Sequence, residues 1–230
     1  MGLKIGLIVG CVALMMLFIC VRTIRGGVWG VATKALASVA FVSAGIIALG
    51  VNGGGLGGAL VVIGLVFGLV GDILLDLKVI YPDNNDFYLN CGMLSFGLGH
   101  IAFAFGLSLL SSPESNLLKC ILISLAIAIV AATLIMLMGK PMKLNFSKFF
   151  FQSFGYAIAL VFMSAYSIAL SLNLKIMFIA AVGFVLFLLS DLVLSTQYFG
   201  GKQDSKPLIV INHALYYLAQ ISIVAFLLFL

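Results

Sequence analysis

Apolar runs long enough to cross a lipid bilayer follow one another along the whole of this 230-residue chain. A helix that crosses a bilayer needs about 20 apolar residues. Hydrophobic residues form 64% of the sequence and charged residues 8%, so a soluble core could not bury the apolar surface. We therefore predict an all-α fold, a polytopic membrane bundle of eight transmembrane helices that forms one integral membrane domain over residues 1–230. The predicted spans are 3–21, 33–50, 56–78, 88–110, 117–138, 149–171, 175–198 and 208–230.

Lysine and arginine are unevenly divided between the two ends of these spans. Nine of the twelve lie on the side of the loops at 22–34, 140–148 and 200–207, and three lie on the other side. Because cytoplasmic loops carry the excess of Lys and Arg, we predict that these basic loops are cytoplasmic and that both termini lie outside a bacterial inner membrane. The charges are confined to short loops, which favours membrane lipids and argues against nucleic acid as partners.

Two aspartates, Asp72 and Asp191, lie inside apolar runs, each six or seven residues before the predicted cytoplasmic end of its span. A carboxylate at such depth costs about 2.5 to 3.5 kcal/mol on insertion scales, and it usually faces a partner or a watery cavity. We predict that the two are catalytic and share one polar pocket, one carboxyl protonated as a general acid and the other ionised. The alternative is that each hydrogen-bonds to a neighbouring helix as a structural contact.

Further polar residues enter the spans from the same side, including Tyr156 in the sixth span. Asp76 follows Asp72 by one helical turn and is either a third site carboxylate or an interfacial residue paired with Lys78. His100, deep in its span, is either functional or held by structural hydrogen bonds. The shallower His213 binds a phosphate headgroup, transfers protons or only marks the membrane interface; these alternatives stay open. The substrate-binding or supporting candidates are Asp76, Asn90, His100, Asn212, His213, Tyr216 and Gln220.

The residue types that hold metals and cofactors are sparse. The four cysteines are scattered without a Cys-x-x-Cys pair, and the two histidines lack the His-x-x-x-His spacing of a zinc helix. No Gly-x-Ser-x-Gly or Gly-x-x-x-x-Gly-Lys motif is present. We predict neither a metal nor a cofactor.

A weak internal match relates the two halves of the sequence. Aligning 71–75 with 190–194 places His100 nearly opposite Gln220, 28 and 29 residues after the respective aspartates. A duplication of 1–114 in 115–230, giving two four-helix halves in the same orientation, explains this match. Chance similarity between apolar sequences is the alternative.

Four motifs, in this order, resemble the YhhN family of eight-span membrane proteins, which includes the animal lysoplasmalogenases. The resemblance implies hydrolysis of the vinyl ether bond of lysoplasmalogens to a fatty aldehyde and glycerophosphoethanolamine or glycerophosphocholine. It also implies that Asp72 and Asp191 are the two acidic motif positions and that His100 and Gln220 accompany them, whereas Asp76 has no place in the family pattern. The motifs are Gly71-Asp72-Ile73-Leu74-Leu75, Gly97-Leu98-Gly99-His100-Ile101-Ala102-Phe103, Phe187-Leu188-Leu189-Ser190-Asp191-Leu192 and Tyr216-Tyr217-Leu218-Ala219-Gln220.

The resulting expectation is an enzyme, a lysoplasmalogenase-like ether-bond hydrolase that acts on a lysophospholipid by acid and carboxylate catalysis. A small-solute or proton-coupled transporter is the main alternative, because carboxylates inside the membrane are also typical of that class. A structural or lipid-binding scaffold is the third. The sequence leaves the oligomeric state and the substrate headgroup open.

Overall fold

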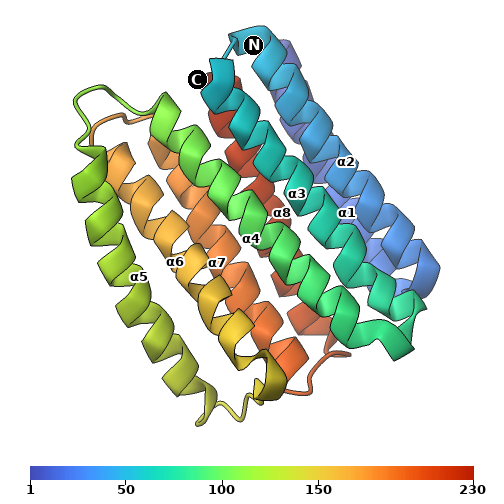
Figure 1. Cartoon of the computed structure of the whole chain (residues 1–230). Helices are drawn as coiled ribbons and strands as arrows, with labels where there is room; N and C mark the ends of the chain where they lie inside the picture. Colours follow the sequence, from blue (N-terminus) through green and yellow to red (C-terminus); the bar gives the residue numbers. More distant parts are fainter. The chain divides into compact units, whose positions relative to one another are not determined.

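The computed structural model describes all 230 residues and is 87% helical, with no strand. Each of its eight long helices is apolar and long enough to cross a membrane. The predicted all-α architecture is confirmed, and the chain is a multi-pass integral membrane protein. The helices are α1 Gly2–Ile24, α2 Gly27–Asn52, α3 Gly55–Ile80, α4 Asn85–Leu110, α5 Leu117–Gly139, α6 Phe150–Ser171, α7 Met177–Phe199 and α8 Lys206–Phe229, with short 3₁₀ turns at Pro82–Asn84 and Ser147–Phe149 (Figure 1).

The second span begins earlier than predicted. It was expected at residue 33, after a loop over 22–34, but α1 continues to Ile24 and α2 begins at Gly27. Gly26 and Gly27 adopt φ of +61° and +52°, a left-handed conformation that glycine takes without strain, and this permits the tight reversal. Arg22 and Lys34 are therefore helical residues, and the prediction that 22–34 is a cytoplasmic loop was wrong. The predicted orientation depends on the other basic residues and stays a prediction.

The chain packs as two compact units. Unit 1 contains residues 1–110 and 220–230, and unit 2 contains residues 111–219. The first boundary lies close to the predicted repeat boundary at 114, but the last turns of α8 group with unit 1. Ancestry is a separate matter from packing, so the duplication and the single domain over 1–230 remain predictions.

In unit 1, α1 packs on α2, α2 on α3 and α3 on α4. Glycines set the spacing between α3 and α4, which run side by side in Figure 1: a Cβ on Gly64 would lie 2.5 Å from the Phe103 ring, and one on Gly71 would lie 2.7 Å from Phe96. Close approach of this kind drives helix association in lipid, where burying apolar surface gains little. The closely packed α3–α4 pair thus fixes the position of the α3 side chains that face away from α4.

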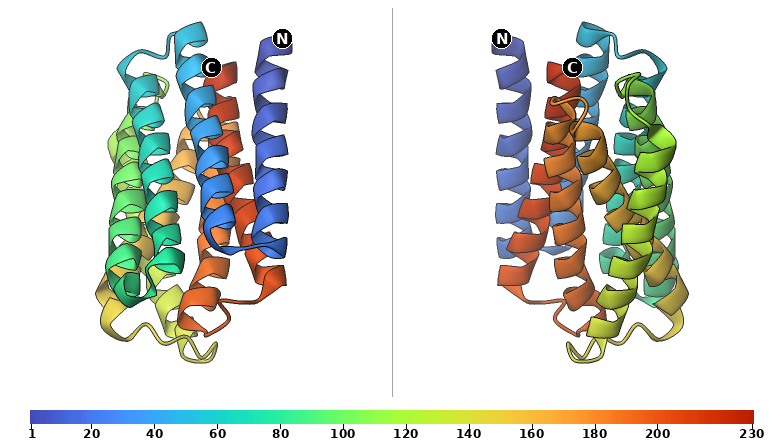
Figure 2. Two further views of the ribbon diagram at one scale, coloured as in Figure 1. Left: turned by 90° about the vertical axis from the view of Figure 1, so that its right-hand side faces the viewer. Right: turned by 90° about the vertical axis from the view of Figure 1, so that its left-hand side faces the viewer.

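The two chain termini lie at one end of unit 1 (Figure 2). There Lys4 Nζ donates to Asn52 Oδ1 at 3.4 Å, and Asn52 Nδ2 donates to the carbonyl of Leu227 at 2.7 Å. Lys4 also lies over the ring of Phe229, 5.4 Å from its centroid. These contacts tie α1, α2 and the end of α8 together.

In unit 2, α6 packs between α5 and α7. Small buried residues of α5, such as Ser124 and Ala128, permit close packing of this helix. Between α6 and α7, the Ser164 hydroxyl lies 3.0 Å from the carbonyl of Leu160 and 3.1 Å from that of Phe184. A second contact joins Tyr156, earlier in α6, to Asp191, later in α7, so the two helices run antiparallel.

Candidate functional site

Asp72, the first membrane aspartate, lies on a face of α3 that differs from the face packed on α4. Gly71 fits against Phe96 of α4, and the next residue, Asp72, projects from a different side of the helix toward α2. Asp76 lies one turn further along the same face. A glycine followed by an aspartate thus lets α3 pack closely on one neighbour while it presents a carboxylate to another.

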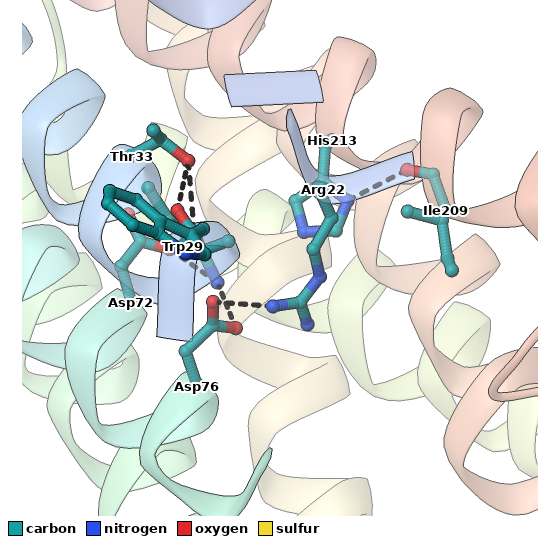
Figure 3. Close-up of polar contacts among 9 residues, drawn as sticks. Arg22, Trp29, Thr33, Asp72, Asp76, Ile209 and His213 are labelled. Carbon is teal, nitrogen blue, oxygen red and sulfur yellow. Dashed lines mark hydrogen bonds and ion pairs between the residues drawn. The ribbon is translucent and has the colours of Figure 1, made fainter. Parts of the chain in front are cut away.

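Asp72 and Asp76 share one buried cluster with basic residues from α1 and α2. Lys34 Nζ lies 3.3 Å from Asp72 Oδ1 and 3.2 Å from Asp76 Oδ1, so it bridges the two carboxylates. The Ser38 hydroxyl donates to Asp72 Oδ2 at 2.6 Å, and Arg22 Nη1 donates to Asp76 Oδ2 at 3.1 Å. Figure 3 shows Arg22 and Asp76 joined by this contact, with Asp72 one turn away on α3.

Burial makes this cluster a strong structural constraint. Asp72, Asp76 and Lys34 are 2%, 3% and 5% exposed. Removing one partner from a buried ion pair costs about 3 to 5 kcal/mol, because an uncompensated charge is left behind. The two carboxylates of α3 are therefore held by side chains from two neighbouring helices, α1 and α2.

Sequence reasoning missed both basic partners. Arg22 and Lys34 were counted as loop charges, whereas each lies within a helix and contacts Asp76. A signal was present: Lys34 and Ser38 are four residues apart, hence on one helical face, as are Asp72 and Asp76. A basic or hydroxyl pair and an acidic pair, each four residues apart on neighbouring spans, is the sequence pattern that indicates such buried contacts.

The second membrane aspartate, Asp191, lies in unit 2. The Tyr156 hydroxyl of α6 donates to Asp191 Oδ2 at 2.5 Å. Asp191 is half-buried, in contrast to the buried Asp72. Its helical turn is also fixed from α8, because Asn212 Nδ2 donates to the carbonyl of Ser190 at 2.8 Å and lies 3.1 Å from its hydroxyl.

Two further candidates from α8 line the same part of unit 2. Tyr216 is 5% exposed and packs edge-on against Phe187 of α7, with ring centroids 5.3 Å apart. His213 Nδ1 lies 2.7 Å from the carbonyl of Ile209 (Figure 3). Since a carbonyl only accepts, Nδ1 is the donor, and in the neutral ring Nε2 is then an acceptor.

The remaining candidates belong to unit 1. His100 repeats the arrangement of His213: its Nδ1 lies 2.8 Å from the carbonyl of Phe96, and its ring packs edge-on against Phe103. Gln220 is fully buried, and neither polar atom of its amide has a hydrogen-bond partner in the protein. Asn90 is half-buried near the start of α4.

Among the predicted site residues, Asp72 and Asp76 form one cluster in unit 1, and Asp191 and Asn212 lie with their partners in unit 2. His100 contacts residues of its own helix, and the Gln220 amide makes no hydrogen bond to either aspartate. The single pocket shared by Asp72 and Asp191 stays a prediction. No group of three or more His, Cys, Asp or Glu side chains is arranged to hold a metal ion.

This fold and these clusters define a class: a multi-pass membrane protein with carboxylates fixed by hydrogen bonds and ion pairs inside its spans. The model of the YhhN family matches residues 29–227, and the chain belongs to this family. That family is linked generally to hydrolase activity, and membership is consistent with a lysoplasmalogenase-like function. No curated protein and no solved structure matches the chain. The family match begins after α1, so Arg22 lies outside it.

Proposed function

We propose that this protein is a membrane-embedded hydrolase that cleaves the vinyl ether bond of a lysoplasmalogen. The products are a fatty aldehyde and glycerophosphoethanolamine or glycerophosphocholine. Asp72 and Asp191 are the two catalytic carboxyl groups. The single acyl-like chain of the substrate lies among the apolar helices, and its headgroup lies at the cytoplasmic side of the membrane.

The observation that carries the proposal is that each aspartate accepts a short hydrogen bond from a hydroxyl group of the preceding helix. Ser38 of α2 donates to Asp72 at 2.6 Å, and Tyr156 of α6 donates to Asp191 at 2.5 Å. A fixed carboxyl inside a membrane span is expensive to maintain and marks a functional position by default. In a chain of the YhhN family, the chemistry that needs two such groups is vinyl ether hydrolysis.

The reaction begins with transfer of a proton to the outer carbon of the vinyl ether double bond. The positive charge that results is shared by the inner carbon and the ether oxygen, as in glycoside hydrolysis. Water then forms a bond to the inner carbon and gives up one proton. The hemiacetal finally breaks its bond to the glycerol oxygen, which takes that proton. Its own hydroxyl proton returns to the carboxylate that supplied the first proton, and the aldehyde is released. One water is consumed and no redox partner is needed.

Within this proposal, the contacts of the two aspartates favour different roles for them. Asp72 is in an ion pair with Lys34, so it serves as the anionic group that stabilises the cation and receives the proton from water. Asp191 contacts the phenol of Tyr156 and serves as the proton donor. General acid and base groups each contribute about 10²- to 10⁴-fold to such reactions.

The test compares three lysophosphatidylethanolamines that differ only in the bond to the chain: vinyl ether, alkyl ether and ester. We expect the purified protein to release a fatty aldehyde from the vinyl ether alone, measured by mass spectrometry. In D₂O the aldehyde should carry one deuterium on the carbon next to the carbonyl. Release of a fatty acid from the ester, or no aldehyde from the vinyl ether, would contradict the proposal.

A transporter is the second candidate, favoured by the buried ion pairs of Lys34 inside membrane-spanning helices. Such carboxylates carry coupling ions or protons in secondary transporters. Proteoliposomes distinguish the two functions. Accumulation of an unmodified solute, with no aldehyde formed from any lysolipid, would favour the transporter.

A further inference from the structure

Arg22 uses only part of its hydrogen-bonding capacity within the protein. A guanidinium group has five N–H donors, and Arg22 makes one side-chain hydrogen bond, from Nη1 to Asp76 Oδ2 at 3.1 Å. Nε and Nη2 donate to no group of the protein. The side chain is 16% exposed, whereas that of Asp76 is 5% exposed. Arg22 thus has a buried side held by Asp76 and donors left over at the edge of the cluster.

Gly30 of α2 makes room for this arginine. A Cβ at position 30 would lie 2.9 Å from Arg22 Cδ and 3.1 Å from Nη1. Any larger residue would force the side chain of Arg22 to move. The arginine is therefore placed by two elements, the space above Gly30 and the carboxylate of Asp76.

The charges around Arg22 favour an additional anion. Lys78, two residues after Asp76, interacts electrostatically with Asp76, Lys34 and Arg22. Lys34 and Lys78 therefore both belong to the electrostatic surroundings of Arg22. An anion beside Arg22 would lie close to these basic groups.

We propose that Arg22 binds the phosphate group of a lysophospholipid through Nε and Nη2. The planar fork of a guanidinium matches two phosphate oxygens, and such charge-assisted pairs are the stronger hydrogen bonds of proteins. Arg22 lies in the last turn of α1, where the end of a membrane-spanning helix reaches the depth of lipid headgroups. That the bound lipid is the substrate rests on the proposed function, whereas binding itself requires no turnover.

The chain contains a built-in reporter for this site. Its single tryptophan, Trp29, directly precedes Gly30, the residue that makes room for Arg22. We propose titration of the full-length protein in nanodiscs with lysophosphatidylethanolamine, followed by intrinsic fluorescence. The phosphate-free comparison is 1-monoacylglycerol with the same chain, and the chain-free comparison is glycerophosphoethanolamine. Lysophosphatidylethanolamine should bind most tightly.

Three variants isolate the guanidinium. Arg22→Gln should weaken lysophosphatidylethanolamine binding about tenfold or more, because charge-assisted hydrogen bonds are lost, and should leave monoacylglycerol binding unchanged. Arg22→Lys keeps a charge opposite Asp76 and therefore controls for folding, and it should also lose affinity because it lacks the fork. Gly30→Ala should weaken binding by displacing Arg22 without removing any charge.

Arg25→Gln is the matched control. Arg25 caps the same helix three residues later, and its guanidinium lies 5.9 Å from the Trp29 ring centroid, so the starting fluorescence will change. The midpoint of the titration should not. An equal loss of affinity in Arg25→Gln and Arg22→Gln would overturn the proposal in favour of general surface charge. Unchanged affinity in Arg22→Gln, or equally tight binding of glycerophosphoethanolamine, would also overturn it.

The same variants separate this inference from the proposed function. If the parent protein binds lysophosphatidylethanolamine through Arg22 but releases no aldehyde, the hydrolase proposal fails and the phosphate site stands. If aldehyde forms and Arg22→Gln leaves KM unchanged for the phosphorylated vinyl ether, the hydrolase stands and the phosphate site fails.

Discussion

The surroundings of Asp72 and Asp191 differ in one essential respect, although both aspartates interrupt an apolar span. Asp72 contacts an ammonium group and a serine hydroxyl, and through Lys34 it is joined to Asp76 and Arg22. Asp191 accepts a hydrogen bond from a phenol, and its neighbour Ser190 is fixed by an amide. One carboxylate is part of a charged network, and the other accepts a hydrogen bond from a phenol. Similar sequence contexts therefore give the two aspartates different partners, and different surroundings are what an acid and a base in one reaction require.

The largest expected effect is on turnover. Asp72→Asn and Asp191→Asn should each lower kcat for vinyl ether hydrolysis by about 10²- to 10⁴-fold, because each removes a proton-transfer or cation-stabilising group. The double variant should lose little more than the worse single variant, since groups that serve one step act as a unit. Aldehyde release measured by mass spectrometry checks this. Fully multiplicative losses would break the link between the two residues.

Lys34→Met should have the largest effect on stability. It leaves two buried carboxylates with one fewer cation, which costs about 3 to 5 kcal/mol. Thermal unfolding in detergent is the measurement. The variant Lys34→Met/Asp76→Asn removes one carboxylate as well and should recover part of the loss. A Lys34→Met protein as stable as the parent would show that the network of unit 1 contributes little.

The two hydroxyl donors allow a matched comparison of the clusters. Ser38→Ala and Tyr156→Phe each remove one hydrogen bond to an aspartate, at a cost of about 0.5 to 1.5 kcal/mol. Because Lys34 still holds Asp72, Ser38→Ala should lower kcat less than Tyr156→Phe does. The ratio of the two kcat values tests the comparison directly. The reverse order would mean that the charged network does not fix Asp72.

The smallest effects concern two asparagines that donate to backbone carbonyls. Asn212→Ala releases the turn before Asp191, whereas Asn52→Ala releases the end of α8 at Leu227. Both should cost about 1 kcal/mol of stability. Only Asn212→Ala should also reduce kcat, by a few fold. Equal kcat values in the two variants would separate Asn212 from the positioning of Asp191.

The sequence was sufficient to predict the eight spans, because the length of an apolar run is fixed by the thickness of the bilayer. It also placed Asp76 on the face of Asp72, since the helical repeat determines which residues share a face. The basic partners of Asp76 could not be predicted from the sequence. Lys34 and Asp76 are 42 residues apart and Arg22 and Asp76 are 54 apart, so only the packing of α1, α2 and α3 brings them together.

Charge was misleading in one segment. A lysine next to an apolar run normally marks the boundary between a loop and a membrane span, and Lys34 is such a boundary in the sequence-based prediction. Its side chain is buried because Asp72 and Asp76 compensate its charge. Tyr156 was recognised as part of a polar lining, but its bond to Asp191 depends on the register of α6 and α7. Gln220 was predicted from the family motif, and its buried, unpaired amide gives no structural reason for its presence.

Helix α8 has a consequence for how this protein is made. Unit 1 includes residues 220–230 as well as residues 1–110. The Asn52 amide group acquires its partner at Leu227 only when the last helix enters the membrane, 175 residues later in synthesis. The half of the molecule that leaves the ribosome first is therefore completed last. A nascent chain halted after α4 would expose an incomplete bundle to lipid and to membrane proteases.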